Sequence, residues 1–121
     1  MSTWSVGRYE AVAEFISPIA VEVVAAVPHG AGTALVDLAC GTGNASLHAA
    51  GLGARVTGVD ITPELLAIAE AKPGGDAVEW VAADASATGL PDASFDTAVS
   101  NMGIIFVEPT AMVAELARLL K

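Results

Sequence analysis

Apolar residues recur at helical spacing through the first part of the chain. Between positions 8 and 27 they form one broad stripe made of Val12, Phe15, Ile16, Ile19, Ala20, Val23, Val24 and Val27. Such a stripe predicts an amphipathic helical segment. Proline disrupts a helix interior, but Ser17 as N-cap with Pro18 at the first helical position turns the interruption into a junction between two helices. We therefore expect residues 1–28 to be helical.

Beyond this segment, short apolar runs alternate with helical stretches. The runs lie at residues 34–39, 56–59, 78–82 and 95–99, and the helical stretches at 44–52, at 63–71 and from Pro109 onwards. Strands that alternate with helices through right-handed crossovers form a parallel sheet with helices on both faces. The pattern predicts an α/β, doubly wound fold and one domain over residues 1–121, with the sheet and its helices in 34–121. The loop before the fourth run has room for a short helix, but its periodicity is weak.

Composition narrows the function classes. The 121 residues carry a formal net charge of -9 and are 54% hydrophobic, and no apolar run approaches the length that spans a membrane. The negative charge disfavours nucleic acid and anionic lipid surfaces. The single cysteine, Cys40, excludes an intrachain disulfide, and no secretion signal is recognisable at the start. We expect a cytoplasmic protein that binds neither membranes nor nucleic acid.

Candidate chemistry lies just after each predicted strand, because ligands of open α/β sheets bind outside the carboxyl ends of the strands. These positions hold Cys40, Gly41, Thr42, Gly43 and Asn44 after the first strand, Asp60 and Ile61 after the second, Asp84 and Ala85 after the third, and Asn101 and Met102 after the fourth. Glycine lets a ligand approach the backbone closely. The strand ends therefore predict a binding site rich in carboxylates.

Each polar group at these ends has a physical use. Asp60 can accept both hydroxyls of a ribose, and Asp84 can accept an exocyclic amine such as that of adenine. Ile61 and Ala85 would provide an apolar slot for the ring. Asp37 lies inside the first predicted strand, where a buried carboxylate must find donors or a cation.

The motifs together resemble the class I S-adenosylmethionine-dependent methyltransferases. The matching segments are VDLACGTG, VTGVDITPELLAIAEAK, VEWVAADASATGLP and FDTAVSNMGIIFVEP. The resemblance implies a Rossmann-like sheet in the order 3-2-1-4 and S-adenosylmethionine as cofactor. It assigns the methionine part to Asp37, Ala39, Gly41 and Gly43, the ribose and adenine to Asp60, Ile61, Asp84 and Ala85, and the methyl group and acceptor to Asn101. Cys40 and Met102 complete the predicted cofactor site, with Cys40 as a small filler and no residue assigned to catalysis.

Plainer interpretations stand beside these. The two loop glycines would suit a simple tight turn, and a dinucleotide-binding fold would need a third glycine where Ser46 stands. Asp60 would also serve as a helix-dipole partner, and Asp84 as a turn-forming residue. Asp96 suits a strand-end hydrogen bond better than chemistry. The histidines have no metal-like spacing to Cys40, so we expect no metal.

Members of the family usually continue past a helix such as ELARLLK with a fifth parallel strand and a final antiparallel pair, which this sequence lacks. The fourth strand would then be an open edge, which proteins seldom leave uncovered. We hypothesise a homodimer through this edge or the last helix. Two functions follow: a methyltransferase acting on a small-molecule acceptor, or a truncated cofactor-binding fragment that is inactive or depends on a partner.

Overall fold

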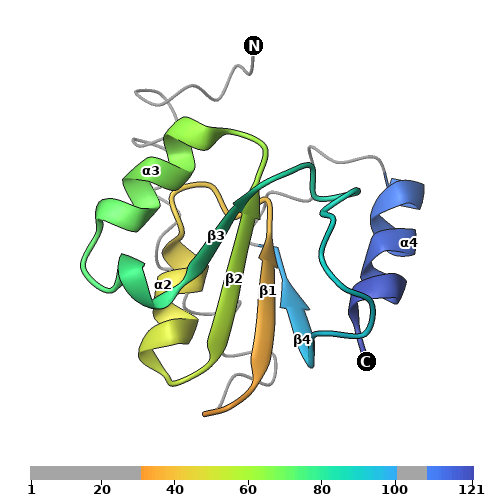
Figure 1. Cartoon of the computed structure of the whole chain (residues 1–121), viewed down its shortest axis with the longest axis horizontal. Coiled ribbons are helices and arrows are strands. Elements are labelled where there is room, and N and C mark those ends of the chain that lie inside the picture. The colour runs from red at the N-terminus through yellow and green to blue at the C-terminus, as the bar shows by residue number, and fades with distance from the viewer. Residues whose placement is uncertain (1–30, 101–108) are drawn as a thin grey trace.

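The fold is a parallel sheet with helices on both faces (Figure 1). The computed structural model describes residues 31–100 and 109–121. Its elements are β1 (Ala34–Leu38), α2 (Asn44–Gly51), β2 (Arg55–Asp60), α3 (Pro63–Ala71), the short 3₁₀ helix η1 (Gly75–Ala77), β3 (Glu79–Ala82), β4 (Thr97–Val99) and α4 (Pro109–Leu119). The predicted helical segment 1–28 lies outside the described residues.

The strand order is β3-β2-β1-β4, as the family resemblance predicted. β1 pairs in parallel with both β2 and β4, with Val36 opposite Thr57 on one side and Ala98 on the other. All five residues of β1 are buried, as expected for a central strand covered on both faces. The carboxyl ends of the strands therefore meet at one edge of the sheet.

Two hydrophobic clusters fill the two sides of the sheet. The first joins Leu35, Val56 and Val99 to Ala45 and Ala49 of α2. The second joins Val36, Leu38, Val59, Ala85 and Phe95 to Leu119 of α4. Figure 1 accordingly shows α4 on the opposite side of the sheet from α2 and α3.

Several strand boundaries differ from the sequence prediction. β1 ends at Leu38 instead of residue 39, because Ala39 has a positive φ of 55°. The fourth ladder begins at Thr97 instead of residue 95, since Phe95 pairs instead with Leu120 in an isolated parallel bridge. The loop before β4 holds no helix; it contains a turn closed by a bridge between Asp84 and Ala87.

Asp96 has the structural role that its position predicted. Its Oδ2 accepts the backbone N–H of Ala34 at 2.8 Å, and its Oδ1 lies 3.0 Å from the Nζ of Lys121. Both bonds hold its pKa below the ordinary value. One carboxylate therefore joins the start of β1, the start of β4 and the residues after α4.

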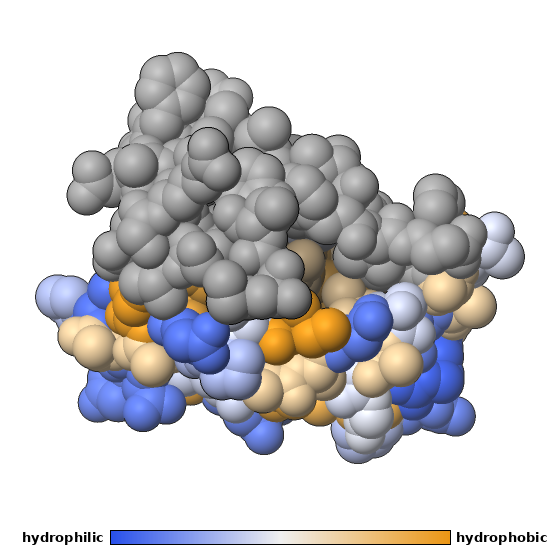
Figure 2. All heavy atoms as spheres, turned by 90° about the horizontal axis from the view of Figure 1, so that it is seen from above, coloured by the Kyte–Doolittle hydropathy of each residue, from blue (hydrophilic) through white to orange (hydrophobic). Residues whose placement is uncertain are grey.

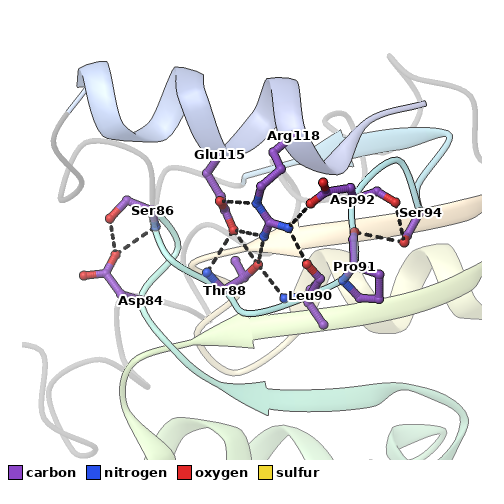
Figure 3. A network of polar contacts seen from close by, with 9 residues as sticks. All are labelled: Asp84, Ser86, Thr88, Leu90, Pro91, Asp92, Ser94, Glu115 and Arg118. Atoms are coloured by element: carbon purple, nitrogen blue, oxygen red, sulfur yellow. Dashed lines mark hydrogen bonds and ion pairs between the residues drawn. The ribbon is translucent and has the colours of Figure 1, made fainter.

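A polar network fastens α4 to the segment between β3 and β4 (Figure 3). The buried Glu115 accepts the N–H and the hydroxyl of Thr88 through Oε2, at 2.9 and 2.6 Å. Arg118 binds both oxygens of Glu115, at 3.0 and 2.7 Å, and also the carbonyl of Leu90 and the carboxylate of Asp92. The Arg118 guanidinium and the Thr88 donors lower the pKa of Glu115 to about 2, so this carboxylate is ionised at neutral pH.

Trp80 of β3 is wedged against two glycines. A Cβ built on Gly58 would lie 2.6 Å from Cζ3 of the Trp80 ring, and one built on Gly43 would lie 2.6 Å from its Cη2. The indole N–H donates to the carbonyl of Gly75 at 2.8 Å, which fixes the ring in this position. The space left by each missing side chain is therefore filled by the indole.

We predict that Gly58→Ala lowers the free energy of unfolding by about 2 kcal/mol, because an added methyl overpacks a filled core. The matched control is Gly51→Ala: a Cβ there meets nothing within 4 Å, so stability should stay unchanged or rise by up to about 1 kcal/mol. Urea unfolding of both variants measures the difference. In the background Trp80→Leu, whose smaller side chain vacates the space, the cost of Gly58→Ala should shrink. Equal costs at positions 51 and 58 would contradict the wedge.

Candidate functional site

The loop after β1 is shaped by its own backbone. Cys40 donates its N–H to the carbonyl of Val59 at 2.8 Å, and the N–H of Gly43 returns to the carbonyl of Cys40 at 3.0 Å. Gly41 and Gly43 both have positive φ, at 58° and 81°, a conformation that glycine adopts without strain. The result is a tight turn that leads directly into α2.

Gly43 has a second reason to be glycine. Sequence reasoning attributed it to close approach of a ligand, but the direction of its missing Cβ points at Trp80 and at Cβ of Ala69. The protein itself occupies that side of Gly43. The close approach of a ligand is therefore not what excludes a side chain on this side of the loop.

Asp60 joins the glycine loop to the start of α3. It is only 8% exposed; its Oδ2 accepts the N–H of Gly41 at 2.8 Å, and its Oδ1 accepts the N–H of Thr62 at 2.9 Å. Each carboxylate oxygen has two lone pairs, so both retain capacity for a hydroxyl donor. Asp60 is thus fixed in direction by the backbone while it remains able to accept further hydrogen bonds.

Asp37 is the most constrained charge in the site. It is 1% exposed, and its Oδ2 accepts the hydroxyl of Ser46 at 2.7 Å. Its Oδ1 has no hydrogen-bond partner among the described residues. Burial, together with the nearby charge of Asp60, raises the pKa of Asp37 from 3.8 to about 7. A donor-bearing cation at Oδ1 would satisfy this atom and favour the ionised form.

Cys40 and Thr42 are buried in the same loop. Burial raises the pKa of the Cys40 thiol well above its ordinary value, and the charges of Asp37 and Asp60 add to this. The thiol is therefore protonated at neutral pH and unsuited to act as a nucleophile. The Thr42 hydroxyl is buried with no partner among the described residues, while its carbonyl accepts Nζ of Lys72 at 3.0 Å.

The pairing of β3 with β2 places the residues predicted to bind adenine beside the end of β2. Ala82 is opposite Asp60, and Ala83 donates its N–H to the carbonyl of Asp60 at 3.0 Å. Asp84 is exposed, and its Oδ1 accepts the N–H and the hydroxyl of Ser86 at 2.8 and 2.6 Å. These bonds lower the pKa of Asp84 and hold the carboxylate in a turn that leaves Oδ2 outside both bonds (Figure 3).

The two apolar residues predicted to flank the ring differ in exposure. Ile61 is 66% exposed, whereas Ala85 is buried in the cluster that includes Leu119. Figure 2 looks down on this end of the molecule and shows hydrophobic residues near its middle, with hydrophilic residues among those below and to either side of them. Ile61 therefore offers apolar surface to a ligand, while Ala85 is part of the core.

The structure thus brings Asp37, Ala39, Cys40, Gly41, Gly43 and Asp60 together at adjacent strand ends, with Ile61, Asp84 and Ala85 beside them. The predicted residues Asn101 and Met102 lie outside the described residues. In residues 31–100 and 109–121, no group of three or more metal-ligating side chains is gathered. Nor is any helix of that part long and apolar enough to cross a membrane.

Sequence reasoning missed several residues that hold the site. Ser46 supplies the donor to Asp37, Lys72 binds the carbonyl of Thr42, and the Ser100 hydroxyl donates to the carbonyl of Leu38 at 2.8 Å. Ser46 carried a signal, because α2 begins directly after the loop and places one face against β1. The other contacts join residues far apart in the sequence.

The raised pKa of Asp37 predicts a pH dependence of stability. Because the native state keeps this proton to higher pH than the unfolded chain, the stability contribution is full below about pH 4 and is lost as pH rises through about pH 7, on the order of 3 kcal/mol. In Asp37→Asn this loss should be absent. Urea unfolding between these pH values measures it, with the exposed Asp76→Asn as control. A wild-type slope in Asp37→Asn would contradict the assignment.

Comparison with known proteins gives the family. A methyltransferase domain model matches residues 36–121. A protein of Mycobacterium tuberculosis is 38% identical over 119 residues, which cover 95% of this chain and 43% of that protein. The demethylmenaquinone methyltransferase of Clavibacter sepedonicus is 39% identical over 98 residues, covering 79% of this chain and 40% of the enzyme. The chain therefore spans less than half the length of these relatives.

Solved structures agree. An S-adenosylmethionine-dependent methyltransferase from Mesorhizobium loti matches with a TM-score of 0.73 and 30% identity, over 85% of this chain and 48% of that chain. A complex of the Haloferax volcanii Trm112 methyltransferase activator with a methyltransferase matches with a TM-score of 0.83 and 28% identity, over 95% of this chain and 52% of that chain. The chain belongs to the methyltransferase domain family, within the class I S-adenosylmethionine-dependent methyltransferases.

Proposed function

We propose that this chain binds S-adenosylmethionine at the carboxyl ends of β1, β2 and β3 and contributes the cofactor half of a methyltransferase. The observation that carries the proposal is the buried Asp37, whose Oδ1 has no partner among the described residues. The methionine part of the cofactor carries an ammonium group, and a cation with N–H donors is what this oxygen requires. The free carboxylate oxygen of Asp37 therefore fits the ammonium group of the cofactor.

The other residues divide the cofactor among them. Asp37, Ala39, Cys40, Gly41 and Gly43 would surround the methionine part, Asp60 the ribose, and Ile61, Asp84 and Ala85 the adenine. Asn101 and Met102 remain proposed neighbours of the methyl group and the acceptor. Asp60 is suited to the ribose because Gly41 and Thr62 already fix the direction of both its oxygens.

When bound, S-adenosylmethionine supplies a methyl group on a positively charged sulfur, from which an acceptor takes it by in-line attack. The chain's own contribution is orientation and exclusion of water. Asp60 and the glycine loop would hold the ligand in a fixed direction, and the buried Asp37, once ionised, would place a negative charge where solvent does not reach.

A small-molecule acceptor is our proposal for the substrate class. The net charge of -9 repels polyanions, and relatives include a demethylmenaquinone methyltransferase and a ubiquinone/menaquinone biosynthesis C-methyltransferase. We propose further that residues 1–121 act as one domain in the cytoplasm, with a helical segment at 1–28 and without contact to nucleic acid.

The short length of this chain relative to the proteins it matches supports a second candidate function. The chain covers 29–43% of the length of the curated relatives cited here, and one matching structure contains a methyltransferase together with its activator. A cofactor-binding module that methylates only with a partner, or not at all, is therefore the alternative. Both candidates bind the cofactor, but only the first transfers a methyl group to a small-molecule acceptor in the absence of a partner protein.

The test is calorimetric titration of the chain with S-adenosylhomocysteine. We expect Asp60→Ala to weaken binding by roughly 10- to 100-fold, because charge-assisted hydrogen bonds contribute about 1.5–3 kcal/mol. Asp60→Asn, which keeps one oxygen acceptor, should lose less. The exposed Asp76→Asn is the charge-matched control and should bind like the wild type. Absence of heat with the wild type, or unchanged affinity in Asp60→Ala, would reject the cofactor site.

We also propose that a second copy of the chain covers the free side of β4, or packs on α4. Among the described strands, β4 pairs with β1 alone, and Val113 of α4 is 65% exposed. Unpaired strand edges invite pairing with another chain. Light scattering at micromolar concentration should give the mass of a dimer. Val113→Glu should shift it toward the monomer if the contact lies on α4, and leave it unchanged if the contact lies along β4. A monomeric wild type would contradict the homodimer.

A further inference from the structure

The turn that carries Asp84 receives its support from α4. The backbone leaves β3 at Ala82 and folds back on itself, with the N–H of Ala87 donating to the carbonyl of Asp84 at 2.9 Å. The next residue, Thr88, is buried and held by Glu115 of α4. The turn is therefore fixed between the end of β3 and one carboxylate of a helix on the far side of the segment.

Glu115 binds Thr88 through two hydrogen bonds and is itself held by Arg118. We call the contacts among Thr88, Glu115 and Arg118 the clamp. Oε2 of Glu115 accepts both the N–H and the hydroxyl of Thr88, and the same hydroxyl accepts the N–H of Leu90 at 3.2 Å. Arg118 holds Glu115 in place through both its oxygens and reaches over to the carbonyl of Leu90 at 2.6 Å. Figure 3 shows these residues meeting between α4 and the segment that follows β3.

The contact between Glu115 and Thr88 affects two of the three residues that we assign to adenine, Asp84 and Ala85. Asp84 lies four positions before Thr88 and is joined to Ala87 by the bridge that closes the turn. Ala85 packs in the same cluster as Leu119 of α4. Because Ser86 holds Oδ1 of Asp84 within this turn, a change in the distance between α4 and the turn would move the Asp84 carboxylate and Ala85 together.

We propose that Glu115, oriented by Arg118, is a positioning residue for the adenine end of the cofactor site, and that it acts through Thr88 on the direction of Asp84. The inference rests on the proposed function. The inference concerns ligand selectivity. A fixed Asp84 carboxylate accepts a hydrogen bond from an exocyclic amine and repels a carbonyl at the same ring position. A clamp that only fastened α4 would stabilise the fold without affecting this discrimination.

The experiment compares two ligands, S-adenosylhomocysteine and its 6-oxo analogue, in which a carbonyl replaces the exocyclic amine. The variants are Thr88→Val, which removes one hydroxyl and keeps the backbone donor, Thr88→Ser, which keeps both, and Glu115→Gln. Lys121→Gln is the control, because it breaks the ion pair with Asp96 at the same end of α4 without touching Thr88. Circular dichroism and thermal unfolding are recorded for every protein.

We expect the wild type, Thr88→Ser and Lys121→Gln to bind S-adenosylhomocysteine at least tenfold more tightly than its 6-oxo analogue. Thr88→Val and Glu115→Gln should lower this ratio by threefold or more. If Glu115→Gln does not fold, Thr88→Val alone decides. Ratios that stay at the wild-type value, or a wild type that binds both ligands equally, overturn the inference and leave cofactor binding intact. A wild type that binds neither ligand rejects the proposed function itself.

Discussion

The carboxylate of Asp60 joins the ends of two strands and sets the geometry around it. One oxygen holds the N–H of Gly41 and the other holds the N–H of Thr62, so the glycine loop and the start of α3 share a single anchor. Because the loop is fixed at Gly41, its second glycine lies against Trp80 and α2 begins at Asn44. One buried side chain therefore fastens the segments that lead into both helices at the site.

Asp37 sets the opposite condition. It lies within the central strand, where a carboxylate has only Ser46 as a described donor. Burial of an incompletely bonded charge costs stability, and the raised pKa expresses that cost. A site that binds a cation gains by this arrangement, since the ligand supplies the interaction that the fold leaves out. If Asp37 binds the cofactor as we propose, stability and affinity are opposed at this residue.

The sequence predicted the sheet well because its strands are short apolar runs bounded by turn signals, and because the motifs carried the strand order. It located Asp60 and the glycine loop at the carboxyl ends of β2 and β1 for the same reason, since these residues lie directly at strand ends. The sequence could not predict two sets of contacts. These join Trp80 to Gly43 and Gly58, and Glu115 to Thr88. Each joins residues that are distant along the chain, and no periodicity records which side chains meet across layers. At Gly43 the structure adds a reason that the sequence did not show, the contact of Trp80 with the side where a Cβ would lie.

Asp96 stabilises the edge of the sheet that lies opposite the candidate site. At the amino edge of the sheet it binds the backbone of Ala34 and the side chain of Lys121, so three segments from across the chain are gathered on the side away from the carboxyl ends of the strands. Loops at those carboxyl ends are then free to differ in length and chemistry while the scaffold beneath them stays registered. A fold built in this way can acquire new substrates by changing one edge only.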